Sequence, residues 1–149
     1  MIPSLMLPAI VALDINPMTE TLFQQISSGG YAEKTLKPKL GYAYVIYSVR
    51  IGAPRLSDGT RLSSDDITFT YFIGSRRGVP IPLVESAHGL ELNLFVIATR
   101  RDPFRMRFDN GYTDTVYCDA TAEYLEVPED KVLLLKDYMR MFFEKVIGR

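Results

Sequence analysis

The sequence predicts an α+β protein: a mainly antiparallel sheet of about five strands, forming a sandwich or a partly closed barrel, with an N-terminal and a C-terminal helix packed on it. Two observations support this prediction. Between residues 41 and 118, several segments alternate apolar and polar residues with the two-residue period of a β-strand. Segments with helical spacing flank this region, and the order helix, strands, helix favours segregated layers over a parallel βαβ array.

The most regular strand pattern lies at residues 90–98. Its even-numbered positions are all apolar, and the odd-numbered ones begin polar and become apolar at Phe95 and Ile97. Because successive strand residues point to opposite faces, we predict one fully apolar face and a second face that is partly covered. Pro103 follows closely and ends the strand, since proline lacks the donor that a ladder needs.

A β-hairpin is predicted directly after this strand. Residues 104–109 alternate apolar and charged side chains, Asn110-Gly111 follows, and a second strand-like run comes next. Asn-Gly is the preferred dipeptide of a type I′ hairpin turn, because both of its positions tolerate positive φ. In that register Arg107 would face Asp114 across the ladder, a favourable pair of opposite charges.

Two further strands are predicted at residues 41–51 and 67–73. The first has apolar or aromatic residues on both faces, which is typical of a central, covered strand. Residues 31–40 are basic and contain proline, which predicts a loop. Pro80 and Pro82 restrict the segment around them to a sheet edge or a loop.

Helix-start signals mark both ends of the predicted sheet. Asn16-Pro17 combines an N-cap residue with proline at the first helical position, and an apolar stripe follows at helical spacing: Met18, Leu22, Phe23 and Ile26. Near the other end, Pro128 and two carboxylates predict the start of a helix over residues 128–147. Its apolar residues cover an arc of roughly 200°, wider than one packing face needs. This helix is therefore either buried between two layers of its own domain or in contact with another chain.

Length and composition favour one globular domain over residues 1–149. The chain has 47% hydrophobic residues, and its 17 basic and 18 acidic residues leave a formal net charge of −1. A chain of this length buries roughly 70% of the surface that it exposes when unfolded, enough for a core without disulfides or metals. Because the net charge is close to zero, no overall electrostatic attraction draws the chain to nucleic acid or to an anionic membrane. The single cysteine excludes an internal disulfide and favours a reducing compartment.

Residues 1–13 are predicted to form an extended apolar arm, because Pro3 and Pro8 disfavour a helix there. The arm has no lysine or arginine, which argues against a signal peptide, and it is shorter than a transmembrane helix, which needs about 20 residues. We expect a soluble protein that resides in the cytoplasm or within a viral particle and is not secreted through a signal peptide. An apolar arm must dock either on its own domain or on a neighbour.

No catalytic or metal-binding motif accompanies the reactive side chains. His88 is the only histidine, and no nucleophile signature such as G-x-S-x-G lies near it. Cys118 is next to Asp119, and a negative neighbour raises the pKa of a thiol, so we interpret this cysteine as a packing residue. The carboxylates between residues 109 and 126 lack the spacing of a calcium loop. The sequence therefore predicts no cofactor and no metal, with an enzyme of unknown type as one alternative.

Nucleic-acid binding is a sharper alternative, because small β-rich domains bind single strands through aromatic stacking and a basic groove. Strand alternation weakens this hypothesis, since Phe104 and Phe108 would project away from the arginines between and beside them. The aromatic residues then belong to the core and the arginines to a solvated or ion-paired face. The residues predicted to contact nucleic acid under this alternative are Arg76, Arg77, Arg105 and Arg107.

The favoured hypothesis is a non-enzymatic structural or assembly subunit of a multi-chain complex. The apolar arm, the wide apolar arc of the last helix and the arginines that alternate with aromatics supply residue types enriched at protein–protein contacts. We expect a homo-oligomer or a larger assembly, for example a viral or phage virion component of the connector, neck or tail type, without membrane association. The predicted contact residues are Leu5, Leu7, Ile10, Arg100, Arg101, Arg105, Arg107, Tyr138, Met141 and Phe142.

Overall fold

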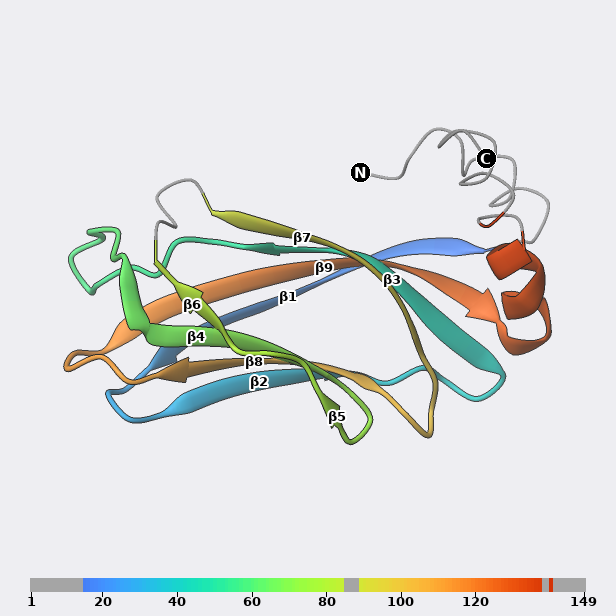
Figure 1. Ribbon diagram of the computed structural model, residues 1–149, viewed down its shortest axis with the longest axis horizontal. Coiled ribbons are helices and arrows are strands. Elements are labelled where there is room, and N and C mark those ends of the chain that lie inside the picture. The colour runs from blue at the N-terminus through green and yellow to red at the C-terminus, as the bar shows by residue number, and fades with distance from the viewer. Residues whose placement is uncertain (1–14, 85–88, 138–139, 141–149) are drawn as a thin grey trace.

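The computed structural model describes residues 15–84, 89–137 and 140, and most of this part of the chain is β-sheet (Figure 1). Nine strands are followed by a 3-10 turn (Glu129–Lys131) and a short helix over residues 132–137. The strands are β1 (Asn16–Ile26), β2 (Tyr31–Leu36), β3 (Tyr42–Ile51), β4 (Ser64–Ile73), β5 (Arg76–Arg77), β6 (Ile81–Leu83), β7 (Leu90–Ala98), β8 (Phe104–Asn110) and β9 (Val116–Pro128).

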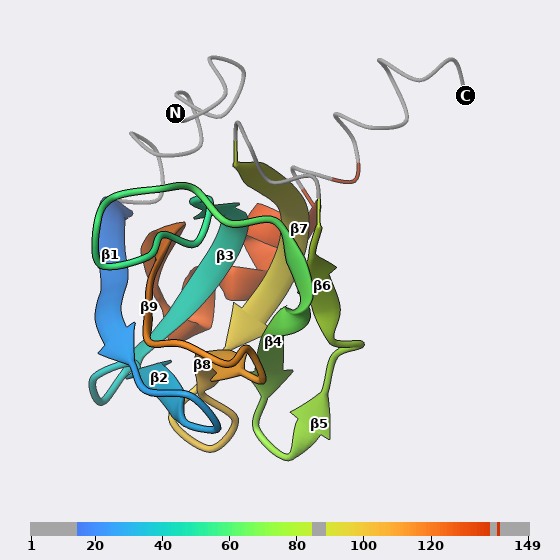
Figure 2. The same cartoon turned by 90° about the vertical axis from the view of Figure 1, so that its left-hand side faces the viewer.

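The strands form two antiparallel sheets that pack face to face (Figure 1), and Figure 2 views this sandwich from one end. One sheet has the strand order β1-β9-β3-β7. The other has the order β2-β8-β4-β5, and β6 also pairs with β4. We name them the β9 sheet and the β8 sheet, each after one of its inner strands.

The pairing of the strands is nested. β1 pairs with β9, β2 with β8, β3 with β7 and β4 with β6, always antiparallel. The paired strands thus form one long antiparallel hairpin. This hairpin is rolled up, so that β9 also pairs with β3 and β8 also pairs with β4. A double sheet connected in this way is a jelly roll, and the two-residue β5 is an addition to it between β4 and β6.

The main core lies between the two sheets and is built from the inward-facing positions of each strand. On β8, Phe104, Met106 and Phe108 are buried, while the residues between them are only half-buried. The rings of Phe108 and Phe69, on β4, lie edge to face with their centroids 5.2 Å apart, a favoured arrangement of two aromatic rings. The alternation in residues 104–109 therefore marks a strand with one buried face.

A second, smaller cluster covers part of the outer side of the β9 sheet. Val45 on β3 and both Leu125 and Val127 on β9 are buried there against Leu135 of the short helix. One side of β3 therefore meets the other sheet and its second side meets the helix. This explains why β3 carries apolar residues on both faces, as expected for a covered strand.

Several predicted strands are confirmed. The segments at residues 41–51, 67–73 and 90–98 correspond to β3, β4 and β7, and β3 is central, between β9 and β7. Pro82 lies in β6, a three-residue strand that pairs only with β4. This agrees with the expectation that a proline in a sheet lies at an edge.

The α+β prediction is wrong, because the N-terminal helix that it requires is a strand. β1 pairs with β9 along its whole length of eleven residues. Met18, Leu22 and Ile26 are four residues apart, a spacing that suits a helix but also places all three on one face of a strand. Phe23 distinguishes the two structures, since it belongs to the helical stripe and yet is 67% exposed. Long-range pairing with β9 therefore outweighs the local helix-start signal.

The C-terminal helix begins later than predicted. β9 continues to Pro128, which is paired with Tyr42 of β3, and the helix starts only after the 3-10 turn. Proline is tolerated here because the pairing of β1 with β9 ends at Glu126, so Pro128 has a strand neighbour on one side only. Residues 138–139 and 141–147 of the predicted helix lie outside the described residues.

The predicted hairpin at Asn110-Gly111 is also wrong, because β8 and β9 belong to different sheets and their loop crosses between them. The buried amide of Asn110 donates to the carbonyls of Ile26 at 3.0 Å and Asp114 at 2.9 Å. Its Oδ1 atom accepts a hydrogen bond from the backbone N–H of Tyr112 at 2.9 Å. These bonds close a wider loop in place of a type I′ turn.

The basic segment at residues 31–40, predicted as a loop, contains β2. This strand pairs with β8 along its whole length, from Tyr31 opposite Asp109 to Leu36 opposite Phe104. Only two of its six side chains are buried, as expected for a strand at the edge of a sheet. The polar composition of this exposed edge strand therefore resembles that of a loop.

Candidate protein-contact surface

The outer face of the β8 sheet carries the arginines of β8. Because the apolar side chains of this strand point into the core, Arg105 and Arg107 point outward. The flanking strands place Glu33 of β2 opposite Arg107, and Phe72 of β4 opposite Arg105. The register therefore surrounds both arginines with a carboxylate and with aromatic rings.

Arg105 is held by an acid on one side and a ring on the other. Its Nε atom lies 3.3 Å from Oε2 of Glu33, and its guanidinium carbon lies 4.0 Å from the centre of the Phe72 ring. Arg77, on β5, reaches the same ring at 5.9 Å. Phe72 is only 9% exposed although it belongs to the outer face, so the arginines stack on a ring that they help to cover.

Arg107 is fixed in a similar way. Its Nη2 atom lies 3.0 Å from Oδ1 of Asp109, two residues along the same strand, and its guanidinium carbon lies 4.0 Å from the centre of the Tyr31 ring. The hydrogen bonds to Asp109 raise the pKa of Arg107, and partial burial opposes this effect. The planar guanidinium suits both contacts, since it pairs with a carboxylate and stacks on an aromatic face.

Two turns extend this face at one end of the sandwich. The N–H of Gly74, between β4 and β5, donates to the carbonyl of Pro103, between β7 and β8, at 2.9 Å. Gly74 has a φ of +59°, and a Cβ there would collide with the carboxylate of Asp102, so the two turns approach closely only with glycine at this position. The contact brings four exposed arginines together: Arg76 and Arg77 of β5, and Arg100 and Arg101 of the second turn.

These four arginines, together with Arg105 and Arg107, form what we name the arginine surface. It is strongly basic for a chain whose net charge is −1. Three carboxylates lie beside it, from Glu33, Asp102 and Asp109. Within the described part of the chain, no ion pair involves the arginines of the two turns, and their charge is exposed. The six members of the arginine surface are Arg76, Arg77, Arg100, Arg101, Arg105 and Arg107.

The structure thus brings together the arginines that the sequence assigned to the protein contact and to the nucleic-acid alternative. The sequence analysis missed their aromatic partners, Phe72 and Tyr31, which only the strand register reveals. The remaining predicted contact residues lie outside the described residues: Leu5, Leu7, Ile10, Tyr138, Met141 and Phe142.

Two reactive side chains are singled out by the sequence, Cys118 and His88. Cys118 is buried in the main core, and this burial, together with the charge of Asp119, raises the pKa of its thiol to about 12. A thiol of this kind does not ionise near neutral pH. His88 lies outside the described residues. Among residues 15–84, 89–137 and 140, no three His, Cys, Asp or Glu side chains cluster to hold a metal, and no helix is long and apolar enough to cross a bilayer.

No protein-family model and no curated protein matches the chain. A distant likeness exists to a chain in the structure of infectious bursal disease virus Gx strain, with 11% identity and a TM-score of 0.35, over 79% of this chain and 32% of that chain. The crystal structure of the infectious bursal disease virus VP2 subviral particle gives 8% identity and a TM-score of 0.23, over 90% of this chain and 49% of that one. The chain therefore spans less than half of each viral chain, and scores this low do not establish a shared fold.

Proposed function

We propose that the chain is a non-enzymatic subunit of a multi-chain assembly and that it contacts a protein partner through the arginine surface. The observation that supports this proposal is the stacking of Arg105 and Arg107 on Phe72 and Tyr31. Arginine and aromatic residues are enriched at protein–protein contacts and among the residues that contribute most to binding. Side chains that are already held in place lose less conformational entropy when a partner binds.

The mixed charges of this surface favour a protein partner. Arg105 and Arg107 are paired with acids, so they offer hydrogen-bond donors without a large uncompensated charge. The exposed arginines of the two turns supply a basic rim that would steer an acidic surface into place. The partner that we propose is a second copy of the same chain, so that the protein forms a homo-oligomer.

The more specific part of the proposal is a structural role in a virus or phage particle, of the connector, neck or tail type. The nested pairing of the strands supports it, since jelly rolls are found in viral capsid proteins. The same architecture is also used by lectins and cupins, so the topology supports this role without specifying it.

Light scattering over a range of protein concentrations tests the proposal. The wild type is expected to exceed the 16.9 kDa mass of one chain, and its association should weaken as salt screens the basic rim. Replacing both Arg100→Glu and Arg101→Glu should weaken association about tenfold or more, because like charges then meet at the contact. The matched control, Arg55→Glu with Arg61→Glu, reverses two charges in the loop between β3 and β4, at the other end of the sandwich, and should leave association unchanged. A 16.9 kDa monomer at every concentration and salt would contradict the homo-oligomer.

Nucleic-acid binding is the second candidate, because four exposed arginines gather at the two turns. The same double variant tests it through the affinity for a single-stranded oligonucleotide. Affinity that falls steeply with salt in the wild type, and is lost in the variant, would favour this function over protein contact. The acids paired with Arg105 and Arg107 argue against it, since they repel phosphate.

A further inference from the structure

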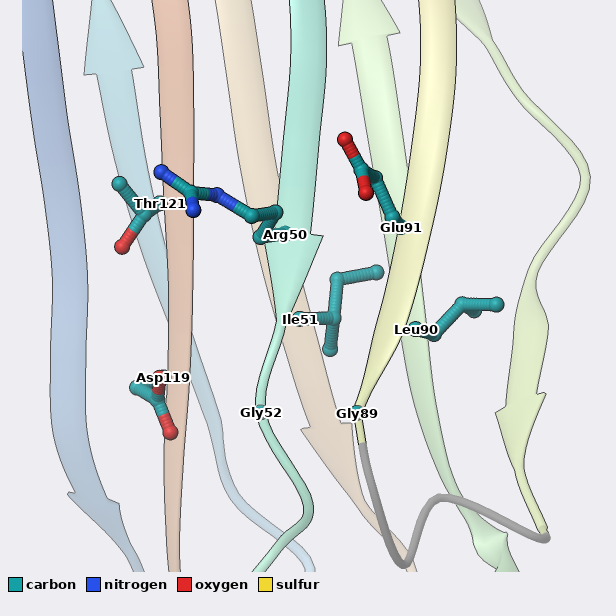
Figure 3. Close-up of a pocket in the computed structure, with 8 residues that line it drawn as sticks. All are labelled: Arg50, Ile51, Gly52, Gly89, Leu90, Glu91, Asp119 and Thr121. Atoms are coloured by element: carbon teal, nitrogen blue, oxygen red, sulfur yellow. The ribbon is translucent and has the colours of Figure 1, made fainter. Parts of the chain in front are cut away.

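A polar hollow lies on the outer face of the β9 sheet (Figure 3). It is lined by residues of two adjacent rows across the β9 sheet, with Phe23 and Thr21 of β1 continuing these rows beside it. In the first row, Phe23 of β1 is opposite Asp119 of β9, and the N–H of Gly52 donates to the carbonyl of Asp119 at 3.0 Å. Gly89, at the start of β7, continues the row beside Gly52. The second row runs Thr21, Thr121, Arg50, Glu91 across β1, β9, β3 and β7.

The hollow exists because two positions in the first row lack side chains. A Cβ at Gly52 would collide with the carboxylate of Asp119. Gly89 has a φ of +83°, and a Cβ there would come within 2.9 Å of the carbonyl oxygen of Ile51. The space has a volume of about 390 Å³, near the lower end of the range of roughly 300–1,000 Å³ that is usual for small-molecule sites.

The side chains around the hollow both donate and accept hydrogen bonds. Arg50 donates to Glu123, which holds its guanidinium over the sheet, and Glu91 accepts a hydrogen bond from Ser48 at 3.3 Å. The hydroxyls of Thr21 and Thr121 lie 3.1 Å apart, and each can still bond to a ligand.

Asp119 is the member of the hollow whose bonding is incomplete. Its side chain is half-buried against Gly52, and within the described residues its carboxylate accepts no hydrogen bond. Burial raises the pKa of Asp119, and the nearby charge of Arg55 only partly offsets this effect. A ligand that donates hydrogen bonds to this carboxylate would replace the water that it loses through partial burial.

The charges around the hollow select the class of ligand. Asp119 and Glu91 repel an anion, while Arg50 and Arg55 disfavour a cation. A neutral ligand with several hydroxyl groups avoids both penalties, since each hydroxyl both donates and accepts. Phe23, 67% exposed beside Asp119, adds an apolar ring on which the C–H face of such a ligand can stack.

We propose that this hollow binds a neutral sugar in its pyranose form, stacked on Phe23 and hydrogen-bonded to Asp119, Thr121 and Arg50. Such a sugar fits the size of the hollow, its mixture of donors and acceptors, and the exposed ring of Phe23 beside Asp119. The proposal does not depend on the arginine surface or on the oligomeric state. The sugar is either free or the terminal residue of a longer glycan, and both present the same hydroxyl groups.

Saturation-transfer NMR at millimolar sugar tests the proposal with the methyl glycosides of glucose, galactose, mannose and N-acetylglucosamine, which also imitate a terminal glycan residue. At least one should receive saturation from the protein, and N-acetylneuraminic acid, an anion, should receive none. Stronger transfer to the free sugar than to its methyl glycoside would identify the free sugar as the ligand.

Asp119→Asn and Phe23→Ala should each weaken the binding of the responding sugar about tenfold, the loss expected for one good hydrogen bond or one stacked ring. Gly52→Val should abolish binding, because its side chain fills the hollow. The matched controls Asp65→Asn and Val79→Ala replace an exposed acid and an exposed apolar residue elsewhere, and should bind as the wild type does. Urea unfolding of each variant confirms that it is folded. No transfer to any of the neutral sugars, or equal loss in the controls, would overturn the proposal.

Discussion

The side chain of Asn110 decides between two local structures, a hairpin turn and a wider loop that crosses between the sheets. Its sequence context, Asn-Gly between two strand-like runs, is that of a hairpin turn. Its amide is instead buried and makes three hydrogen bonds, to Ile26, Asp114 and Tyr112. The bond to Ile26 ties the end of β1 to the loop between β8 and β9, a contact between segments 84 residues apart that no local pattern contains.

Replacing Asn110→Ala should lower the free energy of unfolding by about 1–3 kcal/mol, because the substitution removes three hydrogen bonds and leaves buried partners unsatisfied. Asn93→Ala, on the exposed side of β7, should change it by less than about 0.5 kcal/mol. Urea unfolding of the three proteins measures both effects. Equal stability of the Asn110 and Asn93 variants would mean that the buried amide does not hold this loop.

The raised pKa of Asp119 gives a prediction for stability against pH. The folded state holds this proton more tightly than the unfolded state, so ionisation of Asp119 costs stability as the pH rises from the unfolded pKa, about 3.9, through the folded one. Asp119→Asn removes that cost. In urea unfolding, the variant should therefore gain stability relative to the wild type as the pH rises above the unfolded pKa of about 3.9. A difference that does not change with pH would contradict the account of this carboxyl.

Among the elements, β1 is a strand whose apolar residues are spaced by four, a spacing that predicts a helix. Two side chains test its structure directly. Leu22→Ala should cost about 2–4 kcal/mol, since Leu22 is 6% exposed and packs in the main core. Phe23→Ala should cost less than about 0.5 kcal/mol, since Phe23 points to the solvent from the opposite face. Comparable losses of stability in urea would favour the helix, in which both residues share one stripe.

The loop between β8 and β9 gives a second prediction at this scale. Arg107 pairs with Asp109 on its own strand, whereas a hairpin would pair it with Asp114. A double-mutant cycle for Arg107 and Asp109 should give a coupling of about 0.5 kcal/mol, as expected for a partly exposed ion pair. The same cycle for Arg107 and Asp114 should give none. Urea unfolding of the alanine variants measures both couplings, and the reverse order would support the hairpin.

The strands that the sequence predicts correctly are those with a regular apolar pattern, and this includes β7 although it lies at the edge of its sheet. β3, β4 and β7 show clear apolar alternation or apolar residues on both faces. β1 and β2 are edge strands with few buried side chains, so their pairing partners determine their structure. The arginines of the proposed contact could be predicted because they interrupt an apolar pattern. Their aromatic partners could not, because these lie on other strands and only the strand register brings them together.

At the scale of the whole molecule, the nested pairing places the arginine surface and the polar hollow on opposite sides of one core. No local signal in the sequence predicts this, because each connection that crosses from one sheet to the other is specified by contacts between distant strands. The strand β5 and the turn after β7 meet only because β4 and β8 are neighbours in the wound hairpin. The arginine surface is therefore a product of the topology.

Amide hydrogen exchange, measured at a low concentration and at one where we expect the protein to associate, is the direct test of the proposed contact at this surface. We expect protection to rise with concentration in the two arginine turns, at residues 74–78 and 99–103. The exposed loop between β3 and β4, at the other end of the sandwich, should exchange equally at both concentrations. Protection that rises in that loop and not in the arginine turns would contradict the claim.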